Sequence, residues 1–355
     1  MRIASIVGAR PQFIKAAPLS RVLRQSHYEM LIHTGQHYDY KMSQSFFDEL
    51  EIPEPDINLG VGSGAHGVQT AEMLRGIEEV LIANPFDVVL VYGDTNSTLA
   101  GALAAAKLHI PVAHVEAGLR SYNRRMPEEV NRVLADHIST FLFCPTDRAR
   151  ANLASEGIVE GVHVVGDVML DALRERMRIG LDASSFLSCH GLQAGHYILA
   201  TIHRAENTDD PHRLAAIVRA LAALPEPVLL PLHPRTRVKL ARLDIKLESE
   251  NVCIVEPLGF SAMLTAEQQA RAIVTDSGGV QKEASWLGVP CVTVRDETEW
   301  VETVESGWNV LVEADVEALV RTVRAANRPD APRGSGLGPE EASSRIRVVL
   351  EESLK

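Results

Sequence analysis

The sequence lacks the features of nucleic-acid-binding and membrane proteins. Its formal net charge is −12, so it has no basic footprint for a polyanion, although a local pocket for one small anion stays possible. No apolar run approaches the roughly 18 residues that a membrane span requires, and the first is too short for a signal peptide. We therefore expect neither a nucleic acid nor a membrane as a partner.

Cysteine is also scarce, and the four residues are far apart: Cys144, Cys189, Cys253 and Cys291. There is no CxxC, HxH or HExxH spacing, which argues against a disulfide framework and against a metal site. This pattern fits a reducing compartment, and we expect a cytoplasmic protein without a metal. No GxGxxG follows the first apolar run, so a nicotinamide dinucleotide is disfavoured as well.

What the chain does have is a repeated pattern over 355 residues, a length that favours two domains. Short apolar runs such as "RIASIVG" and "DVVLVYG" alternate with longer amphipathic segments, which is typical of βαβ units and parallel sheets. One set of runs closes near Gly166, and a second begins near Tyr197. The pattern predicts an α/β protein with two Rossmann-like, doubly wound domains that face a cleft.

The expected boundaries follow from this pattern. Residues 1–166 form an N-terminal domain with acidic side chains, and residues 167–338 form a C-terminal domain with an anion-binding loop. A Gly/Pro-rich stretch, "PDAPRGSGLGP", precedes a terminal helix in residues 339–355, which we expect to pack back on the N-terminal domain. Unusual polar residues follow many of the expected strands, where parallel sheets bind ligands.

The stretch "TDSGGVQKEA" places two glycines at an expected junction between strand and helix. Gly278 and Gly279 would let a backbone approach a ligand closely, the helix N-terminus would attract an anion, and Ser277 would add a hydroxyl. Glu283 could accept hydrogen bonds from ribose hydroxyls. This composition suits a diphosphate, although Asp276 or Ser277 could simply cap the helix.

Two further groups contain cationic residues or histidine. Arg10 and Lys15 flank a proline at an expected helix start, where they would hold phosphate or sugar groups or lie solvated on the surface. His203, at the end of the first strand of the second domain, could neutralise or protonate a leaving group. It could equally be a buried histidine with its hydrogen bonds satisfied.

Acidic residues form the last group. Asp94 and Glu116 each follow an apolar run, and an acid in that position is costly unless it is paired or used. Asp94 could instead cap a helix at Thr95, and Glu128 and Glu129 would be favoured by a helix dipole in any case. Clustered carboxylates raise one another's pKa and so make acid/base pairs.

Taken together, these motifs resemble the non-hydrolysing UDP-N-acetylglucosamine 2-epimerases, which have a GT-B fold. The motifs that carry the resemblance are "GARPQFIK", "TGQHYD", "GDTNSTLAGA", "HVEAGLRSYNRRMPEEVNR", "TIHRAEN", "HPRT" and "TDSGGVQKEA". The resemblance implies reversible inversion at C2 of UDP-N-acetylglucosamine, giving UDP-N-acetylmannosamine for polysaccharide biosynthesis, without any cofactor. It also implies a UDP-sugar as the substrate partner and a homodimer.

By position, the resemblance assigns UDP binding to one set of residues: Arg10, Lys15, His203, Ser277, Gly278, Gly279 and Glu283. It assigns acid/base catalysis to Asp94, Glu116 and Glu128, with His203 at the leaving group. Arg132 would lie near the sugar or the diphosphate. Which carboxylate faces which side of C2 stays open.

The chain departs from the best-known bacterial pattern at Trp300-Val301, where those enzymes have Arg-Pro and the arginine contacts substrate. A second departure concerns a regulatory UDP-sugar site, where an arginine is missing although Gln36 and His37 are retained. Allosteric activation through that site is therefore doubtful. Relatives that act on UDP-2,3-diacetamido-2,3-dideoxy-glucuronate are an alternative, in which Arg124 or Arg125 would pair with a sugar carboxylate. A hydrolysing 2-epimerase is a second alternative.

Overall fold

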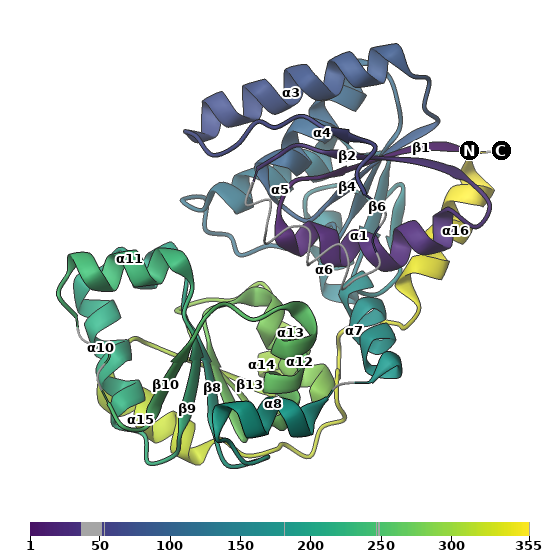
Figure 1. Ribbon diagram of the computed structural model, residues 1–355. Coiled ribbons are helices and arrows are strands. Elements are labelled where there is room, and N and C mark those ends of the chain that lie inside the picture. Colours follow the sequence, from purple (N-terminus) through teal and green to yellow (C-terminus); the bar gives the residue numbers. More distant parts are fainter. Residues whose placement is uncertain (37–51, 53, 181, 246, 248, 355) are drawn as a thin grey trace. The chain divides into compact units, whose positions relative to one another are not determined.

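The computed structural model describes residues 1–36, 52, 54–180, 182–245, 247 and 249–354 (Figure 1). The chain divides into an N-terminal unit, residues 1–175 with 338–355, and a C-terminal unit, residues 176–337. No helix in these ranges is both long and apolar enough to cross a membrane. His37 lies outside the described residues.

The N-terminal unit contains a seven-stranded sheet in the order β3-β2-β1-β4-β5-β6-β7, with every pair of neighbours parallel. Its strands are β1 (Arg2–Val7), β2 (Tyr28–His33), β3 (Ile57–Asn58), β4 (Val88–Tyr92), β5 (Val112–Val115), β6 (Phe141–Cys144) and β7 (Val162–Val164). The central strand β4 is buried along its whole length, as expected where helices cover both faces of a parallel sheet.

Helices on both faces enclose this sheet: α1 (Arg10–Leu23), α3 (His66–Ala83), α4 (Asn96–Lys107), α5 (Pro127–Ile138), α6 (Asp147–Ser155), α7 (Val168–Ile179) and α16 (Ala342–Ser353). Gly101 lets α4 lie directly on the sheet, because a Cβ there would be 3.1 Å from side-chain atoms of both Ile6 and Val91. The terminal helix α16 packs beside α1 (Figure 1).

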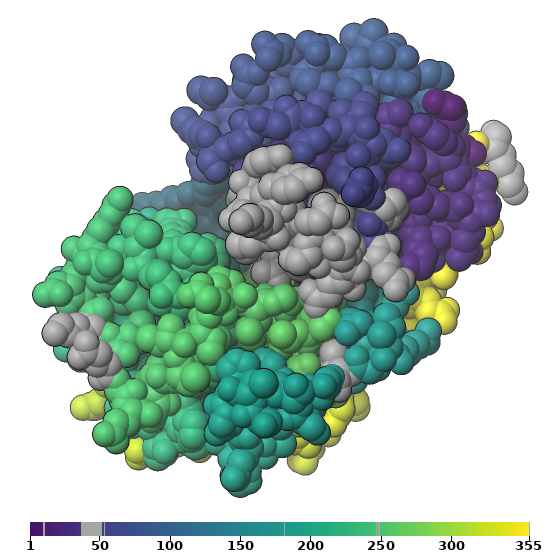
Figure 2. All heavy atoms as spheres, in the orientation of Figure 1, coloured from purple at the N-terminus to yellow at the C-terminus, as the bar shows by residue number. Residues whose placement is uncertain are grey.

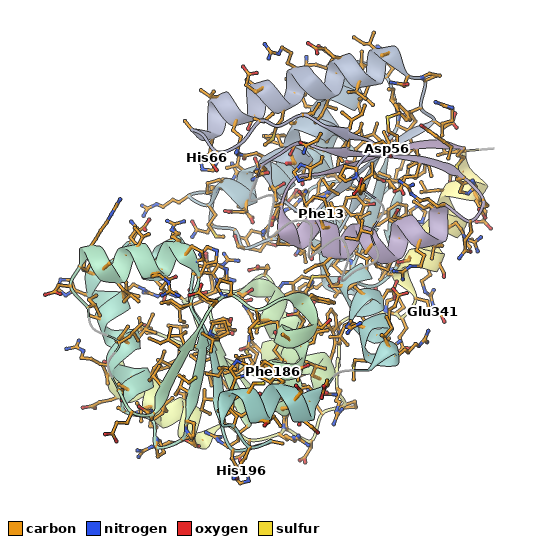
Figure 3. All side chains as sticks on the ribbon, viewed as in Figure 1. Phe13, Asp56, His66, Phe186, His196 and Glu341 are labelled. Carbon is orange, nitrogen blue, oxygen red and sulfur yellow. The ribbon has the colours of Figure 1, made fainter. Side chains whose placement is uncertain are left out.

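Helix α3 shows how its sequence divides between core and solvent. Its buried residues recur every four positions: Gln69, Met73, Ile77 and Leu81. The opposite side is open to solvent, as the blue spheres at the top of Figure 2 show. His66, labelled in Figure 3, begins the helix, and its ring nitrogen lies 3.1 Å from Asn96 Nδ2, which links α3 to the start of α4.

The C-terminal unit contains a six-stranded parallel sheet in the order β10-β9-β8-β11-β12-β13. Its strands are β8 (Ile198–Thr201), β9 (Val228–Pro231), β10 (Val252–Val255), β11 (Ala272–Thr275), β12 (Cys291–Val294) and β13 (Asn309–Val312). Its helices are α8 (Ala183–His190), α9 (Ala205–Thr208), α10 (Pro211–Ala222), α11 (Pro234–Arg242), α12 (Phe260–Gln269), α13 (Gly278–Leu287), α14 (Val301–Glu305) and α15 (Val316–Ala325).

The predicted fold class, two doubly wound parallel sheets, is confirmed, and both sheets reverse strand order beside their first strand. The two units divide inside α7, whereas the sequence places a boundary between residues 166 and 167. Strands β2, β3 and β13 were not among the strands expected from the pattern. In β2, the apolar run is interrupted by Glu29, which the structure nevertheless buries.

Glu29 is tolerated in the core because donors surround its carboxylate. Ser5 Oγ donates to it at 2.6 Å, Arg24 Nε donates at 2.8 Å, and Ser20 Oγ makes a third bond. We predict that Glu29→Gln lowers the free energy of unfolding by about 1–3 kcal/mol, because the charged acceptor of these bonds is lost.

The measurement is urea unfolding followed by circular dichroism. Glu72→Gln is the matched control, since Glu72 is exposed and pairs with Arg75 on the same helix face. It should change stability by less than about 0.5 kcal/mol. Equal unfolding midpoints for the two variants would contradict the prediction.

Candidate functional site

The turns after β4 and β5 carry the two predicted acids Asp94 and Glu116. Gly93 and Glu116 both have left-handed backbones, with φ of 62° and 71°. That conformation is costly for a glutamate, and such strain clusters at functional sites. The turn is held in place by Phe143, whose carbonyl oxygen accepts from the backbone N–H groups of Glu116 and Ala117, each at 3.1 Å.

Lys15 reaches Glu116 from the neighbouring helix α1, and Lys15 Nζ forms a close ion pair with Glu116 Oε2. Both side chains are largely buried. A Cβ on Gly93 would be 3.0 Å from Lys15 Nζ and 3.2 Å from Glu116 Oε2, so glycine leaves room for this pair. The structure thus brings a residue predicted for phosphate binding together with a residue predicted for acid/base chemistry.

Arg132, on α5, contacts two further acids, Asp94 and Glu129. Arg132 Nη2 forms a close ion pair with Asp94 Oδ2, and Arg132 Nη1 donates to Glu129 Oε2 at 2.9 Å. Asp94 does not cap α4, since Thr95 occupies that position, and its side chain stays 30% exposed. Arg132 therefore leaves part of the Asp94 carboxylate accessible.

The two adjacent acids Glu128 and Glu129 lie in different environments. Glu129 is buried and accepts from Ser121 N at 3.0 Å, Ser121 Oγ at 2.9 Å and Tyr122 N at 2.9 Å, so it anchors the loop before α5. Glu128 is exposed in the first turn of α5. Of this pair, only Glu128 is open to a ligand.

In the C-terminal unit, Asp276 joins the loops after β8 and β11. It is fully buried and accepts from His203 N at 3.1 Å, Arg204 N at 3.0 Å and Asn207 Nδ2 at 3.1 Å. These bonds show that Asp276 holds the loop that carries His203. The alternative in which Asp276 caps α13 is not what the structure contains.

Ser277 is the N-cap residue of α13, but within the described part of the chain its hydroxyl makes no capping bond. The first N–H groups of α13 therefore keep the anion-binding capacity of a helix N-terminus. A Cβ on Gly278 would be 2.5 Å from Glu299 Oε1, so only glycine fits there without displacing Glu299. Gly279 follows in the first turn.

Glu283, farther along α13, faces a second acid. It is buried opposite Glu267 of α12, which is fully buried. Burial raises the pKa of Glu267 well above its ordinary value, and the neighbouring Glu283 raises it further. The sequence pattern did not indicate this pair of neighbouring acids.

His203 has a polar and an aromatic neighbour. Its Nδ1 is 3.3 Å from Asp276 Oδ1, and its ring lies 5.7 Å from the ring of His233, which caps α11. Burial lowers the pKa of His203, Asp276 opposes that change, and Arg204 and Arg235 add to it. The net lowering favours a neutral imidazole at neutral pH.

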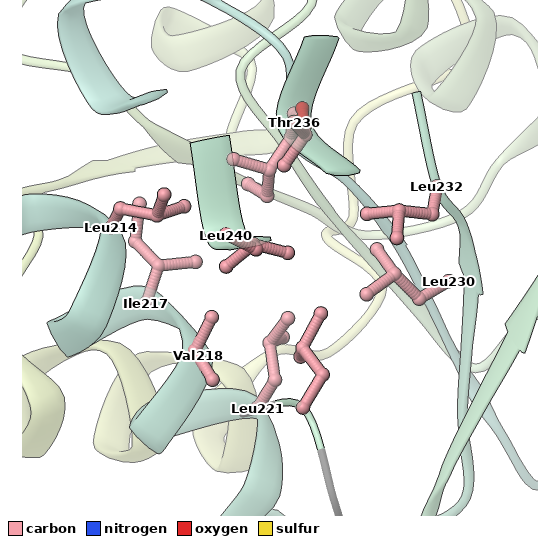
Figure 4. A pocket seen from close by; sticks show the side chains of 10 residues that line it. Leu214, Ile217, Val218, Leu221, Leu230, Leu232, Thr236 and Leu240 are labelled. Carbon is pink, nitrogen blue, oxygen red and sulfur yellow. The ribbon is translucent and has the colours of Figure 1, made fainter. Parts of the chain in front are cut away.

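Two other features carry less information. Arg10 begins α1, but its side chain lies outside the described atoms. An apolar pocket between α10, α11 and β9 is lined almost entirely by aliphatic side chains (Figure 4). Its polar residue Thr236 already donates to the carbonyl oxygen of Ile202 at 2.6 Å. We therefore assign no catalytic role to the residues that line this pocket.

Comparisons with known proteins agree with this arrangement. A family model described as UDP-N-acetylglucosamine 2-epimerase matches residues 21–351. A UDP-N-acetylglucosamine 2-epimerase homolog of Methanococcus maripaludis is 51% identical over 99% of both chains. A UDP-2,3-diacetamido-2,3-dideoxy-D-glucuronate 2-epimerase of Pseudomonas aeruginosa is 50% identical, also over 99% of both chains.

Among solved structures, that of the Methanocaldococcus jannaschii UDP-GlcNAc 2-epimerase in complex with UDP-GlcNAc and UDP superimposes with a TM-score of 0.93. It is 42% identical and covers 99% of this chain and 100% of its own. The two doubly wound units therefore belong to the GT-B type of fold that these epimerases have.

His203 provides a test of the C-terminal site. We predict that its imidazole titrates below 6.5, and that Asp276→Asn lowers the midpoint further because the opposing carboxylate charge is removed. Proton NMR of the histidine ring signals, assigned with a His203→Asn variant, measures the midpoint. The control Asp296→Asn, an exposed acid beside Arg213, should leave it unchanged. A midpoint that rises in Asp276→Asn would contradict the electrostatic assignment.

Proposed function

Because the chain belongs to the UDP-N-acetylglucosamine 2-epimerase family and is thus an isomerase, we propose that it interconverts UDP-N-acetylglucosamine and UDP-N-acetylmannosamine. The observation that carries this proposal is the pairing of acids with cations at the ends of β4 and β5. Lys15 binds Glu116 there, and Arg132 binds Asp94. Inversion at C2 needs two proton-transfer groups, and this edge supplies several carboxylates.

The proposed reaction has two steps. A carboxylate removes the C2 proton, the C–H electrons form a double bond between C1 and C2, and the C1–O bond breaks so that its electrons leave with UDP. The products of this anti-elimination are 2-acetamidoglucal and UDP. In the second step the UDP oxygen adds back to C1. A proton adds to C2 from the same side as UDP, which is the face opposite to the one that lost its proton, and this syn addition gives the epimer. Atoms and charge balance without any oxidant.

Within this proposal, the acid/base work falls to the N-terminal unit. Asp94, Glu116 and Glu128 are the candidate groups, because Asp94 and Glu128 are accessible and Glu116 lies in a strained turn. Lys15 and Arg132 would orient Glu116 and Asp94 toward the sugar through their ion pairs. By family position, Arg10 would bind the UDP portion of the substrate.

The C-terminal unit would hold UDP. The open N-terminus of α13 suits the departing diphosphate, with Ser277, Gly278 and Gly279 supplying hydroxyl and backbone donors. Glu283 would accept from the ribose hydroxyls. His203 would lie beside the diphosphate. Its lowered pKa favours the neutral imidazole, which would donate an N–H hydrogen bond to the leaving diphosphate.

A second candidate substrate is UDP-2,3-diacetamido-2,3-dideoxy-glucuronate, because the 50% identical Pseudomonas relative is named for it. Trp300 also favours it. The indole is only 2% exposed, its Nε1 lies 3.5 Å from where a Gly278 Cβ would be, and Lys282 Nζ lies 3.9 Å from its ring centroid. Trp300 thus packs behind Gly278. The substrate contact that the bacterial enzymes make with an arginine at this position would fall to a different cationic residue. Arg124 and Arg125 are exposed and available for a sugar carboxylate.

The first test is proton NMR of the protein with each of the two UDP-sugars in deuterated water. We expect the C2 proton signal to disappear while the epimer grows, because the proton lost at C2 is replaced from solvent. Release of free N-acetylmannosamine and UDP would establish the hydrolysing alternative. Epimerisation without deuterium at C2 would refute the elimination mechanism.

A second test addresses the acids. Asp94→Asn, Glu116→Gln and Glu128→Gln should each lower kcat at least about 100-fold, the scale of general acid–base catalysis. Glu160→Gln, an exposed acid in the same unit, is the matched control and should keep the full rate. Near-normal turnover in all three site variants would rule out carboxylate acid/base catalysis.

A further inference from the structure

His114 lies on β5, two positions before Glu116, and its side chain is completely buried. Its Nδ1 is 2.7 Å from Asp136 Oδ1, and its Nε2 is 2.7 Å from the carbonyl oxygen of Gly93. A carbonyl oxygen only accepts hydrogen bonds, and so does an ionised carboxylate. If Asp136 is ionised, both ring nitrogens must donate, and the ring carries a proton on each.

The surroundings of Asp136 keep it ionised. Arg120 Nη1 donates to Oδ2 at 2.6 Å, and the backbone N–H of Gly118 donates to the same oxygen at 3.2 Å. Burial raises the pKa of Asp136, but His114 and Arg120 outweigh burial and hold that pKa below its ordinary value. Independently of His114, Oδ2 accepts from both Arg120 and Gly118, as an ionised carboxylate does.

A cationic ring would also complete an alternation of charge. Arg120 continues from Asp136 to Glu156, with Nε and Nη2 at 2.7 Å and 2.9 Å from its two carboxylate oxygens. With a protonated His114, the charges alternate along the chain of contacts and sum to zero.

The other groups packed around the ring supply no charge of their own. The strand residues in register with His114 are Val91 on β4 and Leu142 on β6. Cys144, at the end of β6, lies near Asp136, and burial together with Asp136 raises the pKa of its thiol to about 12. It therefore stays a neutral thiol and does not alter the balance.

The network ends on the two turns that carry the acids. The Gly93 carbonyl held by His114 belongs to the peptide bond that joins Gly93 to Asp94. The Gly118 N–H held by Asp136 lies just beyond Glu116, in a backbone with φ of 79° where a Cβ would be 2.4 Å from the Ala149 carbonyl oxygen. One buried ion pair thus touches both turns from behind.

We propose that His114 is a positioning residue whose ring donates from both nitrogens, to Asp136 and to the Gly93 carbonyl oxygen, and so sets the peptide plane before Asp94 and the turn around Glu116. Hydrogen bonds from a charged donor are roughly twice as strong as neutral ones, so the Gly93 peptide is held firmly. A shift of about 1 Å in a reacting group costs about 100-fold in rate. The effect on turnover rests on the proposed function, whereas the charge on the ring does not.

The charge is tested by nitrogen-15 NMR of histidine rings in the whole chain. We expect one imidazole with two protonated nitrogens at pH 7, because both hydrogen-bond partners of the ring are acceptors. The His114→Gln variant identifies the signal by its loss, and Asp136→Asn identifies it by conversion to a singly protonated ring. A singly protonated His114 ring in the wild-type protein at pH 7 overturns the proposal.

The positioning effect is tested by kinetics on whichever UDP-sugar the wild-type protein converts. His114→Gln and Asp136→Asn should each lower kcat about 10- to 100-fold and leave KM within about threefold, because substrate contacts are untouched while the acids are misplaced. His163→Gln, a partly buried ring on β7 in the same sheet, is the control and should keep kcat.

The outcomes separate this proposal from the proposed function. An unchanged kcat in a folded His114→Gln variant overturns the positioning effect, even if the ring is charged. Should either variant fail to fold, the other and the ring signal of the wild-type protein still decide. A wild-type protein that converts neither sugar refutes the proposed function, and the nitrogen-15 signature then supports or overturns the imidazolium by itself.

Discussion

The carboxylate of Asp136 is the contact on which the N-terminal site depends. It is buried, so its charge is sustained only by donors, and those donors come from His114, Arg120 and the backbone of Gly118. Removing any of these donors would destabilise the fold, because the buried charge would lose a partner that offsets its desolvation. Because the same donors also hold the turns that carry Asp94 and Glu116, burial of this one charge and geometry of the acids are linked.

The C-terminal unit also contains a buried aspartate whose carboxylate accepts hydrogen bonds from a neighbouring loop. Asp276 is also fully buried and also collects donors from a neighbouring turn, through the backbone N–H groups of His203 and Arg204. By binding that loop instead of capping α13, it leaves the helix N-terminus for an anion. In each unit, a buried aspartate thus organises the strand-end loops and leaves other polar groups exposed for chemistry.

Several features could be predicted from residues close in sequence. The alternating runs predicted the parallel sheets, and the acid after β4 and the glycines that begin α13 pointed to the two candidate sites. The partners of these residues could not be predicted in this way. Lys15 seemed a phosphate ligand by its helix position, yet its ammonium group lies on Glu116, which is distant in sequence. Glu128 and Glu129 could be separated only when the packing of α5 showed which one faces Ser121.

The sequence by itself determined the fold class and, through its ordered motifs, the family, because periodic burial and local turn chemistry are written in neighbouring residues. Only the tertiary structure decided how charges pair. The strand order places β1 beside β4 and β4 beside β5, so residues from distant segments meet at one edge. The hydrogen bonds of His114 and the strain at Glu116 arise from that assembly, and the acid pair of Glu267 and Glu283 arises where α12 packs on α13. Each depends on which groups are desolvated together.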